Sequence, residues 1–156
     1  MRRYLVLLLA LGACVDTGQS SPEPLGRLIG TWQVVERGYQ RGDSAWTETE
    51  PGLYMFSEGY YAIQEIREAH GPRALFNETT TDAERLSAFD VFHAHSGSYR
   101  VDGDRLLVTP TLAKGPNTMA GSAAEYLLEW EADRLRVIRA SAAEDERRVT
   151  VLRRLE

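Results

Sequence analysis

Two histidines, His93 and His95, lie on one face if both belong to the same strand. Alternate strand residues point the same way, and imidazole titrates near neutrality, so the pair could bind a metal, shuttle protons or hydrogen-bond a ligand. A metal site needs about three or four ligands, and His70, in a long loop, would supply one only by folding over. We therefore expect no metal. The alternative to a ligand contact is that one histidine lines a barrel while the other meets solvent or a helix end.

A single carboxylate, Glu65, has a chemistry that depends on which face of its strand is internal. If the face with Tyr61 and Ile63 is internal, Glu65 is buried, its pKa is raised and it is a candidate acid or base. If the opposite face is internal, Glu65 is solvated. Because carboxylates are almost never fully buried unless they are paired, we favour the solvated arrangement.

The chain lacks the short motifs that mark common catalytic machineries. It has no Gly-rich phosphate loop, no C-x-x-C pair, no H-E-x-x-H helix and no G-x-S-x-G elbow. We therefore expect no cofactor and no enzymatic activity. The catalytic alternative is a barrel isomerase or cyclase that uses His93, His95 and Glu65.

The only cysteine, Cys14, follows a short apolar segment at the start of the chain. Two arginines precede an apolar run over residues 4–11, and the small residues Gly12 and Ala13 come after it. This pattern is typical of a secretory signal, and the run is far shorter than the roughly 20 residues that span a bilayer. An ordinary signal peptide with an incidental cysteine is the alternative.

The tetrapeptide Leu11-Gly12-Ala13-Cys14 resembles the lipobox of bacterial lipoproteins. The resemblance implies cleavage before Cys14, a thioether-linked diacylglycerol on its sulfur and usually an acyl chain such as palmitate on its amine. Residues 1–13 are then a lipoprotein signal peptide, residues 14–27 a lipid-anchored flexible tether and residues 28–156 the folded domain. We expect attachment to the bacterial cell envelope on its periplasmic side, and Val15, in place of an aspartate, favours the outer membrane.

Composition limits the partners and the architecture of the mature chain. Loss of the two arginines in the signal leaves 16 basic and 23 acidic residues, a formal charge of −7. An acidic domain without a basic cluster excludes nucleic acid as an expected partner, so membrane contact should rest on lipidated Cys14. No second cysteine is present to form a disulfide, and about 130 residues suffice for one apolar core. We expect one domain and a monomer.

The folded part of the sequence predicts an all-β domain. Short β-branched and aromatic runs alternate with turns; Ser57-Glu58-Gly59 and Asp102-Gly103-Asp104 are the clearest hairpin links. The strands are expected at residues 31–37, 53–56, 60–66, 95–101, 105–112, 124–130, 135–140 and 148–155. Because each strand is followed by its hairpin partner, this order favours an eight-stranded antiparallel up-and-down barrel.

One helix interrupts the strands. Thr81 and Glu84 have the spacing of a capping box, and Leu86 and Phe89 follow at helical spacing, so we predict a short helix over residues 82–91. The helix and the long segment 68–80 before it could cover the mouth of the barrel.

Several segments resemble the bacterial and fungal lipocalin-like family of calycin barrels. Gly30-Thr31-Trp32 is similar to the family's G-x-W strand, and the match continues through residues 52–60, 96–103, 116–121 and 153–155. The resemblance implies a barrel with a closed end and an open mouth. It also implies that Trp32, two residues after Gly30, fills the closed end beneath an arginine from the last strand. By position this arginine is Arg154, with Arg153 as the alternative. Thr118 and His95 depart from the family, which often has aromatic residues there.

We predict that the barrel binds a small, largely apolar molecule, since eight strands enclose just enough space for one. The alternatives are a structural or interaction lipoprotein with a filled barrel, and the isomerase or cyclase named above. A lumen of roughly 300 Å³ or more would favour binding. The tentative ligand contacts are one histidine and the aromatic residues expected in the strands, namely Tyr54, Phe56, Tyr61, His95, Tyr99 and Trp130.

Overall fold

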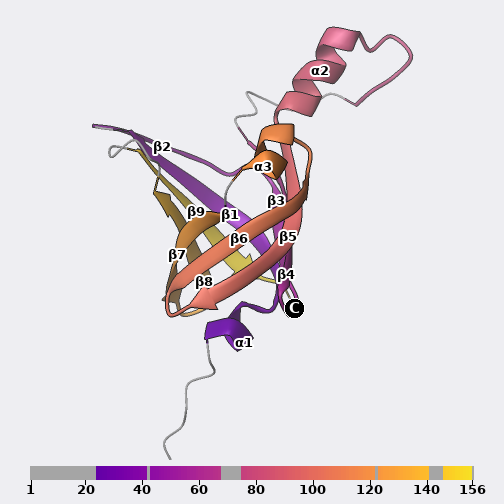
Figure 1. The fold of residues 1–156 in the computed structure, drawn as a ribbon. Coiled ribbons are helices and arrows are strands. Elements are labelled where there is room, and N and C mark those ends of the chain that lie inside the picture. The colour runs from indigo at the N-terminus through magenta and orange to yellow at the C-terminus, as the bar shows by residue number, and fades with distance from the viewer. Residues whose placement is uncertain (1–23, 42, 68–74, 122, 141–145, 156) are drawn as a thin grey trace, which may run out of the picture.

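Antiparallel strands make up most of the protein and form a closed barrel (Figure 1). The computed structural model describes residues 24–41, 43–67, 75–121, 123–140 and 146–155, so the predicted signal peptide, Cys14 and His70 lie outside the described residues. The strands are β1 Gly30–Arg41, β2 Ser44–Glu48, β3 Gly52–Phe56, β4 Tyr60–Ile66, β5 Phe92–Asp102, β6 Arg105–Ala113, β7 Ala124–Glu131, β8 Arg134–Ala140 and β9 Glu146–Arg154. The helices are α1 Pro24–Leu28, α2 Asp82–Asp90 and α3 Pro116–Ala120.

The first and last strands close the barrel. β1 pairs with β9 from Trp32 opposite Arg154 to Arg41 opposite Glu146, and β3 to β9 follow as a meander. The predicted eight-stranded antiparallel barrel is confirmed. The sequence did not predict β2, which pairs with the far end of β1. β1 therefore continues to Arg41, where we expected it to end at residue 37, and the β1–β2 hairpin projects beyond β3.

A filled core and a short helix block one end of the barrel. Trp32 is 3% exposed, its ring lies 6.0 Å from that of Trp130, and its indole N–H donates to the carbonyl of Leu28 at 2.8 Å. Leu28 is the last residue of α1, Pro24–Leu28, so this hydrogen bond joins the helix to the first strand of the barrel. The Arg154 guanidinium carbon lies 4.4 Å from the centre of the Trp32 ring, where cation–π attraction favours it.

From its closed end to its middle, the barrel is filled by side chains. They point inward at alternate positions along each strand. The buried apolar cluster includes residues from α1 and from every strand of the barrel. Its members on the strands are Trp32, Val34, Tyr54, Phe56, Tyr61, Ile63, Tyr99, Leu106, Val108, Leu128, Leu135, Val137 and Leu152. Toward the other end, which we call the mouth and where α3 lies, the described residues enclose a cavity (Figure 1).

Helix α2 forms where the sequence predicts it, but it does not cover the mouth. The capping box is present: the Glu84 amide donates to the Thr81 hydroxyl, and the Glu84 carboxylate accepts from the Thr81 amide. None of the residues of α2 is buried, and the helix stands away from the barrel (Figure 1). Its described contacts to the barrel include Lys114, whose ammonium lies 3.8 Å from the centre of the Phe89 ring. No helix in the described residues is long and apolar enough to cross a bilayer.

Candidate ligand-binding site at the barrel mouth

A buried ion-pair network lies directly below the mouth. The Arg37 guanidinium donates to Glu65 Oε2 at 2.9 Å, and both side chains are almost completely buried. The Tyr54 hydroxyl donates to the same oxygen at 3.0 Å, and Arg67 pairs with Oε1. Arg37 also lies 3.5 Å from Glu48, whose carboxylate accepts from the Tyr39 hydroxyl. The network caps the apolar core with paired charges.

A bulge in β1 turns Arg37 into the barrel. The pairing of β1 with β9 shifts register between Val34 and Glu36, so the inward residues are Trp32 and Val34 before the shift and Arg37 and Tyr39 after it. An extra residue in one strand reverses which side chains face inward beyond it. Strict alternation from Trp32 would have placed Glu36 inside, whereas Glu36 is exposed. Because of the bulge, the guanidinium of Arg37 lies inside the barrel and the carboxylate of Glu36 lies outside it.

Gly52 makes room for the pair. A Cβ atom at Gly52 would lie 2.7 Å from a terminal nitrogen of Arg37, 2.8 Å from Val34 Cγ2 and 2.9 Å from Glu65 Cβ. These separations are shorter than real Cβ contacts, so a larger residue would force the guanidinium or the neighbouring strands to move. The glycine allows Arg37 to cross β3 and reach Glu65 on β4.

The expectation that Glu65 is solvated is wrong. Its face of β4, with Tyr61 and Ile63, is internal, and Glu65 is 2% exposed. Burial alone would raise the pKa of the carboxyl, but attraction by Arg67 and Arg37 outweighs burial and holds the pKa below its ordinary value. The expectation overlooked these two partners. Glu65 is therefore an ionised carboxylate paired with two arginines, and not the protonated acid that an isolated buried glutamate would be.

His95 forms a hydrogen-bonded pair with Tyr61 beside this network. The Tyr61 hydroxyl lies 2.9 Å from His95 Nδ1, and the two rings meet edge to face with centres 5.4 Å apart. Burial lowers the pKa of His95 and raises the pKa of Tyr61 to about 12, so both are neutral at pH 7. We assign the shared proton to the hydroxyl because a phenol donates readily to an unprotonated imidazole nitrogen. Nε2 of His95 then carries the ring proton.

A cavity of about 430 Å³ opens above the network at the mouth. Its floor and walls come from β5 to β8, and α3 contributes Asn117 and Thr118 to its rim. Apolar contact is offered by Val108, Pro110 and Ala124. The polar and aromatic residues that line it are Arg67, His93, His95, Asn117, Thr118, Tyr126 and Arg139. Among the described lining residues none comes from α2, so α3 takes the covering position that we expected of α2.

The residues predicted to contact a ligand fall in different places. His95 lines the mouth cavity, and Tyr54 and Tyr61 lie below it, where each hydroxyl is hydrogen-bonded. Phe56 and Tyr99 pack edge to face within the filled core, with ring centres 5.4 Å apart. Trp130 lies at the closed end, where Arg27 covers its ring at 4.3 Å. The arrangement thus brings together His95, Tyr61 and Tyr54, but not Phe56, Tyr99 or Trp130.

Sequence reasoning missed four residues of the mouth: Arg37, Arg67, Tyr126 and Arg139. Two had a readable signal, because Tyr126 alternates with Leu128 on β7, and Arg139 alternates with Leu135 and Val137 on β8. Arg37 had none, since its orientation follows from the bulge. Arg67 follows the last residue of β4 and is positioned by its pairing with Glu65.

The histidines are not part of a metal cluster within the described residues. His93 lines the same cavity as His95, and on β4 the residues opposite them are Glu65 and Ile63, respectively. No group of three or more histidine, cysteine, aspartate or glutamate side chains with the geometry of a metal site occurs in the described part of the chain. The geometry instead arranges the histidines as part of a cavity wall.

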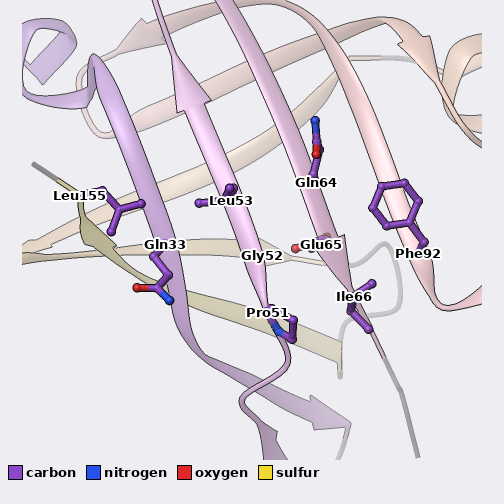
Figure 2. A pocket seen from close by; sticks show the side chains of 9 residues that line it. All are labelled: Gln33, Pro51, Gly52, Leu53, Gln64, Glu65, Ile66, Phe92 and Leu155. Atoms are coloured by element: carbon purple, nitrogen blue, oxygen red, sulfur yellow. The ribbon is translucent and has the colours of Figure 1, made fainter. Parts of the chain in front are cut away.

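A second hollow lies on the outer surface and not in the lumen. It has a volume of about 390 Å³ and crosses β1, β3, β4 and the start of β5. Figure 2 shows Gln33, Leu53 and Gln64 on neighbouring strands at this hollow, with Phe92 at one side and Leu155 at the other. Leu53 and Leu155 are each 38% exposed, so the groove is open to solvent. Its lining is mainly apolar but includes Gln33 and Gln64, and it lacks the arginines and histidines that line the mouth.

Comparisons with known proteins find no matching family model and no curated protein of significant sequence similarity.

Proposed function

We propose that the protein is a lipocalin-like lipoprotein of the bacterial cell envelope that binds a small molecule at the mouth of its barrel. The cavity of about 430 Å³ carries this proposal, since it combines apolar walls with a few converging polar side chains. Small-molecule sites have this character and volumes of roughly 300–1,000 Å³. Membership of the lipocalin-like family is supported by Gly30-Thr31-Trp32 and by the position of Arg154 over Trp32.

The cavity also favours a ligand-binding barrel over a structural barrel whose lumen is filled throughout. Below Tyr61 and Tyr54 the lumen is packed with side chains, which the structural alternative requires throughout. On the side of β1, β8 and β9 the remaining space is only about 20 Å³, enough for about one water molecule. At the mouth the packing stops and the larger cavity begins, so the bound molecule would lie above the core and near the opening.

The catalytic alternative rests on the hydrogen bond between Tyr61 and His95. A second titratable group within reach of His95 is what proton transfer requires. Against it, Nδ1 is occupied by Tyr61 and Nε2 carries a proton, so neutral His95 has no lone pair to act as a base toward the cavity. Glu65 is held ionised by Arg37 and Arg67. The site is thus better suited to binding than to proton abstraction.

The membrane attachment is proposed from the start of the chain. Cys14 follows a basic start, an apolar run and two small residues, which together resemble a lipoprotein signal and lipobox. Cleavage before Cys14 and addition of a diacylglycerol would hold the barrel at the envelope through acyl chains, since two or more chains anchor a protein firmly.

Native mass spectrometry of the full chain, produced in a bacterium and extracted gently from its envelope, tests both parts. We expect a polypeptide that begins at Cys14 and carries the added lipid, with an additional small molecule that is lost on stronger activation. Cys14→Ser should give an unlipidated chain that still carries the small molecule. An unlipidated wild-type chain would contradict the anchor.

A cavity-filling variant locates the bound molecule. Ala124 lines the mouth cavity, and Ala124→Trp should remove the small molecule from the mass spectrum. Leu127→Trp is the matched control, because Leu127 lies on the same strand but is 37% exposed. A wild-type spectrum with no bound molecule, or one equally loaded in Ala124→Trp, would contradict binding at the mouth.

A further inference from the structure

The mouth carries an excess of positive charge in a chain whose formal net charge is −5. Several of its charges are paired: Arg37 and Arg67 with Glu65, Arg37 also with Glu48, and Arg148 with Glu146. Arg139 forms no ion pair with any described residue. It follows Leu135 and Val137 on the inward face of β8, and its guanidinium carbon lies 5.9 Å from the centre of the Tyr126 ring. One cation at the mouth is thus left without a counter-charge among the described residues.

The cavity is also lined mainly by hydrogen-bond donors. Arg139 and Arg67 present guanidinium N–H groups, and His95 presents Nε2–H once Nδ1 has accepted from Tyr61. Asn117 and Thr118 add an amide and a hydroxyl at the rim. No aspartate or glutamate occurs among the described residues that line the cavity. A ligand that brings acceptor atoms and negative charge satisfies these groups, whereas a purely apolar ligand would desolvate them without replacement.

We propose that the mouth cavity binds an apolar molecule that carries a single oxyanion group, with that group held by Arg139 and the Nε2–H of His95. This inference rests on the proposed binding function and gives its ligand a chemical class. The apolar body of the ligand lies against Val108, Pro110 and Ala124. A planar guanidinium binds an oxyanion by two parallel hydrogen bonds, which fixes its orientation.

Arg139, and not Arg67, is the group that selects the charge. Arg67 lies 23% exposed at the edge of the cavity, but its guanidinium already pairs with the fully buried Glu65. An incoming anion would have to compete with that carboxylate. Arg139 is exposed at the mouth and has no such competitor among the described residues. Replacing Arg139 should therefore remove the preference for anions and leave the ion-pair network below intact.

Two dyes with the same ring skeleton test the charge preference. 8-Anilinonaphthalene-1-sulfonate is an anion, and N-phenyl-1-naphthylamine lacks the sulfonate, so fluorescence titrations of both with the full chain separate the charge from the ring system. Arg139→Gln should weaken binding of the sulfonate dye by about tenfold, the expected loss of one charge-assisted contact, and change the neutral dye by less than about twofold. Arg139→Lys keeps the charge but cannot form the two parallel hydrogen bonds, so it should recover only part of the sulfonate affinity.

The matched control is Arg136→Gln. Arg136 lies on the same strand and pairs with Glu129 on the outer face. Its replacement by glutamine changes the net charge of the protein by the same amount as Arg139→Gln. It should leave both dyes unaffected. If both dyes bind the wild type and respond equally to Arg139→Gln, the anion preference is wrong while the proposed binding function stands. If neither dye binds, or if Ala124→Trp does not weaken them, the mouth is not a binding site and both proposals fall.

Discussion

Arg37 and Glu65 form an ion pair of 2.9 Å inside the barrel, although they come from strands that are separated in the sheet by β3. Their side chains are 3% and 0% exposed. Arg37 also donates to the carbonyl of Ile66 at 2.9 Å, so the guanidinium ties β1 to the end of β4. Such a pair adds little net stability compared with apolar packing, but removal of one partner leaves a buried charge uncompensated. Loss of either partner should therefore destabilise the barrel at this level.

Glu65→Gln should destabilise the protein by about 3–5 kcal/mol at pH 7, because Arg37 and Arg67 lose their shared counter-charge. Urea unfolding followed by circular dichroism measures the free energy of unfolding. The control is Glu125→Gln, which removes a carboxylate from an exposed pair with Arg105 and should cost less than about 1 kcal/mol. Equal effects of the two changes would show that the buried pair has no special role.

Glu65→Gln should also change how the free energy of unfolding depends on pH in acid. The folded-state pKa of Glu65 lies below its ordinary value of 4.5. The carboxylate therefore contributes stability that is present above pH 4.5 and is lost as the pH falls through the folded-state pKa. The difference in unfolding free energy between wild type and Glu65→Gln should shrink steadily below pH 4.5. A difference that stays constant down to pH 3 would contradict this assignment.

Gly52→Ala should cost about 1–3 kcal/mol, since its new Cβ would overlap Arg37, Val34 and Glu65 and overpacking has costs of this order. Thermal and urea unfolding both report the loss. Gly38→Ala is the comparison, because Gly38 lies on β1 and a Cβ there would meet Val149 at an ordinary 3.9 Å. Gly38→Ala should be neutral or stabilising, as alanine reduces the freedom of the unfolded chain. Comparable losses at the two sites would argue against the tight fit at Gly52.

The sequence predicted the barrel well because barrel formation depends on a repeated local pattern. Alternating apolar residues and the hairpin at Asp102-Gly103-Asp104 specify strands and their order, and Gly103 adopts a φ of 61° in that turn. The end of β1 was harder to predict, since its partner there, β2, is a five-residue strand in which polar residues outnumber apolar ones. Pairing with β9 along its full length supports β1 as far as Arg41.

The candidate site was only partly predictable because it depends on contacts between distant residues. A one-residue bulge reverses the inward face of β1, and no local pattern around Val35 marks it. Glu65 is buried because two arginines, Arg37 and Arg67, neutralise it, so its own hydrophilicity was misleading. His95 was found because its spacing from His93 is a local feature. Residues whose orientation follows from a distant partner are not visible in a single sequence.

The stability of the protein should fall as the pH drops below 6.5 because of His95. Burial lowers the pKa of His95 from 6.5, so below that pH the unfolded chain binds a proton that the folded chain does not. The charged and titratable groups around it are Tyr61, Glu65, Arg67, His93 and Arg139. His95→Gln should remove this loss of stability. For one proton, the free energy of unfolding changes by at most about 1.4 kcal/mol per pH unit.

Urea unfolding of wild type and His95→Gln at pH 7.5 and pH 5.5 measures the effect. The variant should be less stable than wild type at the higher pH, because it lacks the contact with Tyr61, and the gap should narrow at the lower pH. A gap that widens on acidification would mean that the folded protein holds His95 protonated, which contradicts the lowered pKa.

Arg154→Ala should loosen the closed end and cost about 1–2 kcal/mol. The change removes the cation from the Trp32 ring and the hydrogen bond from Arg154 to the carbonyl of Ile29, which is 2.7 Å long. Arg153→Ala is the neighbouring control, since Arg153 is exposed and its hydrogen bond to Gln33 is a longer 3.3 Å. It should change the free energy of unfolding by less than about 0.5 kcal/mol. The reverse order of the two effects would contradict the role assigned to Arg154.

A small molecule that occupies the mouth cavity above the Arg37–Glu65 network should perturb the residues that line it. The most direct measurement is a ¹H–¹⁵N NMR titration of the full chain with 8-anilinonaphthalene-1-sulfonate. We expect the amide signals of Val108, Ala124, Tyr126 and Arg139 to shift, while those at the closed end, such as Trp32 and Leu152, stay in place. Shifts confined to the outer groove around Leu53, Gln64 and Phe92 would contradict binding at the mouth.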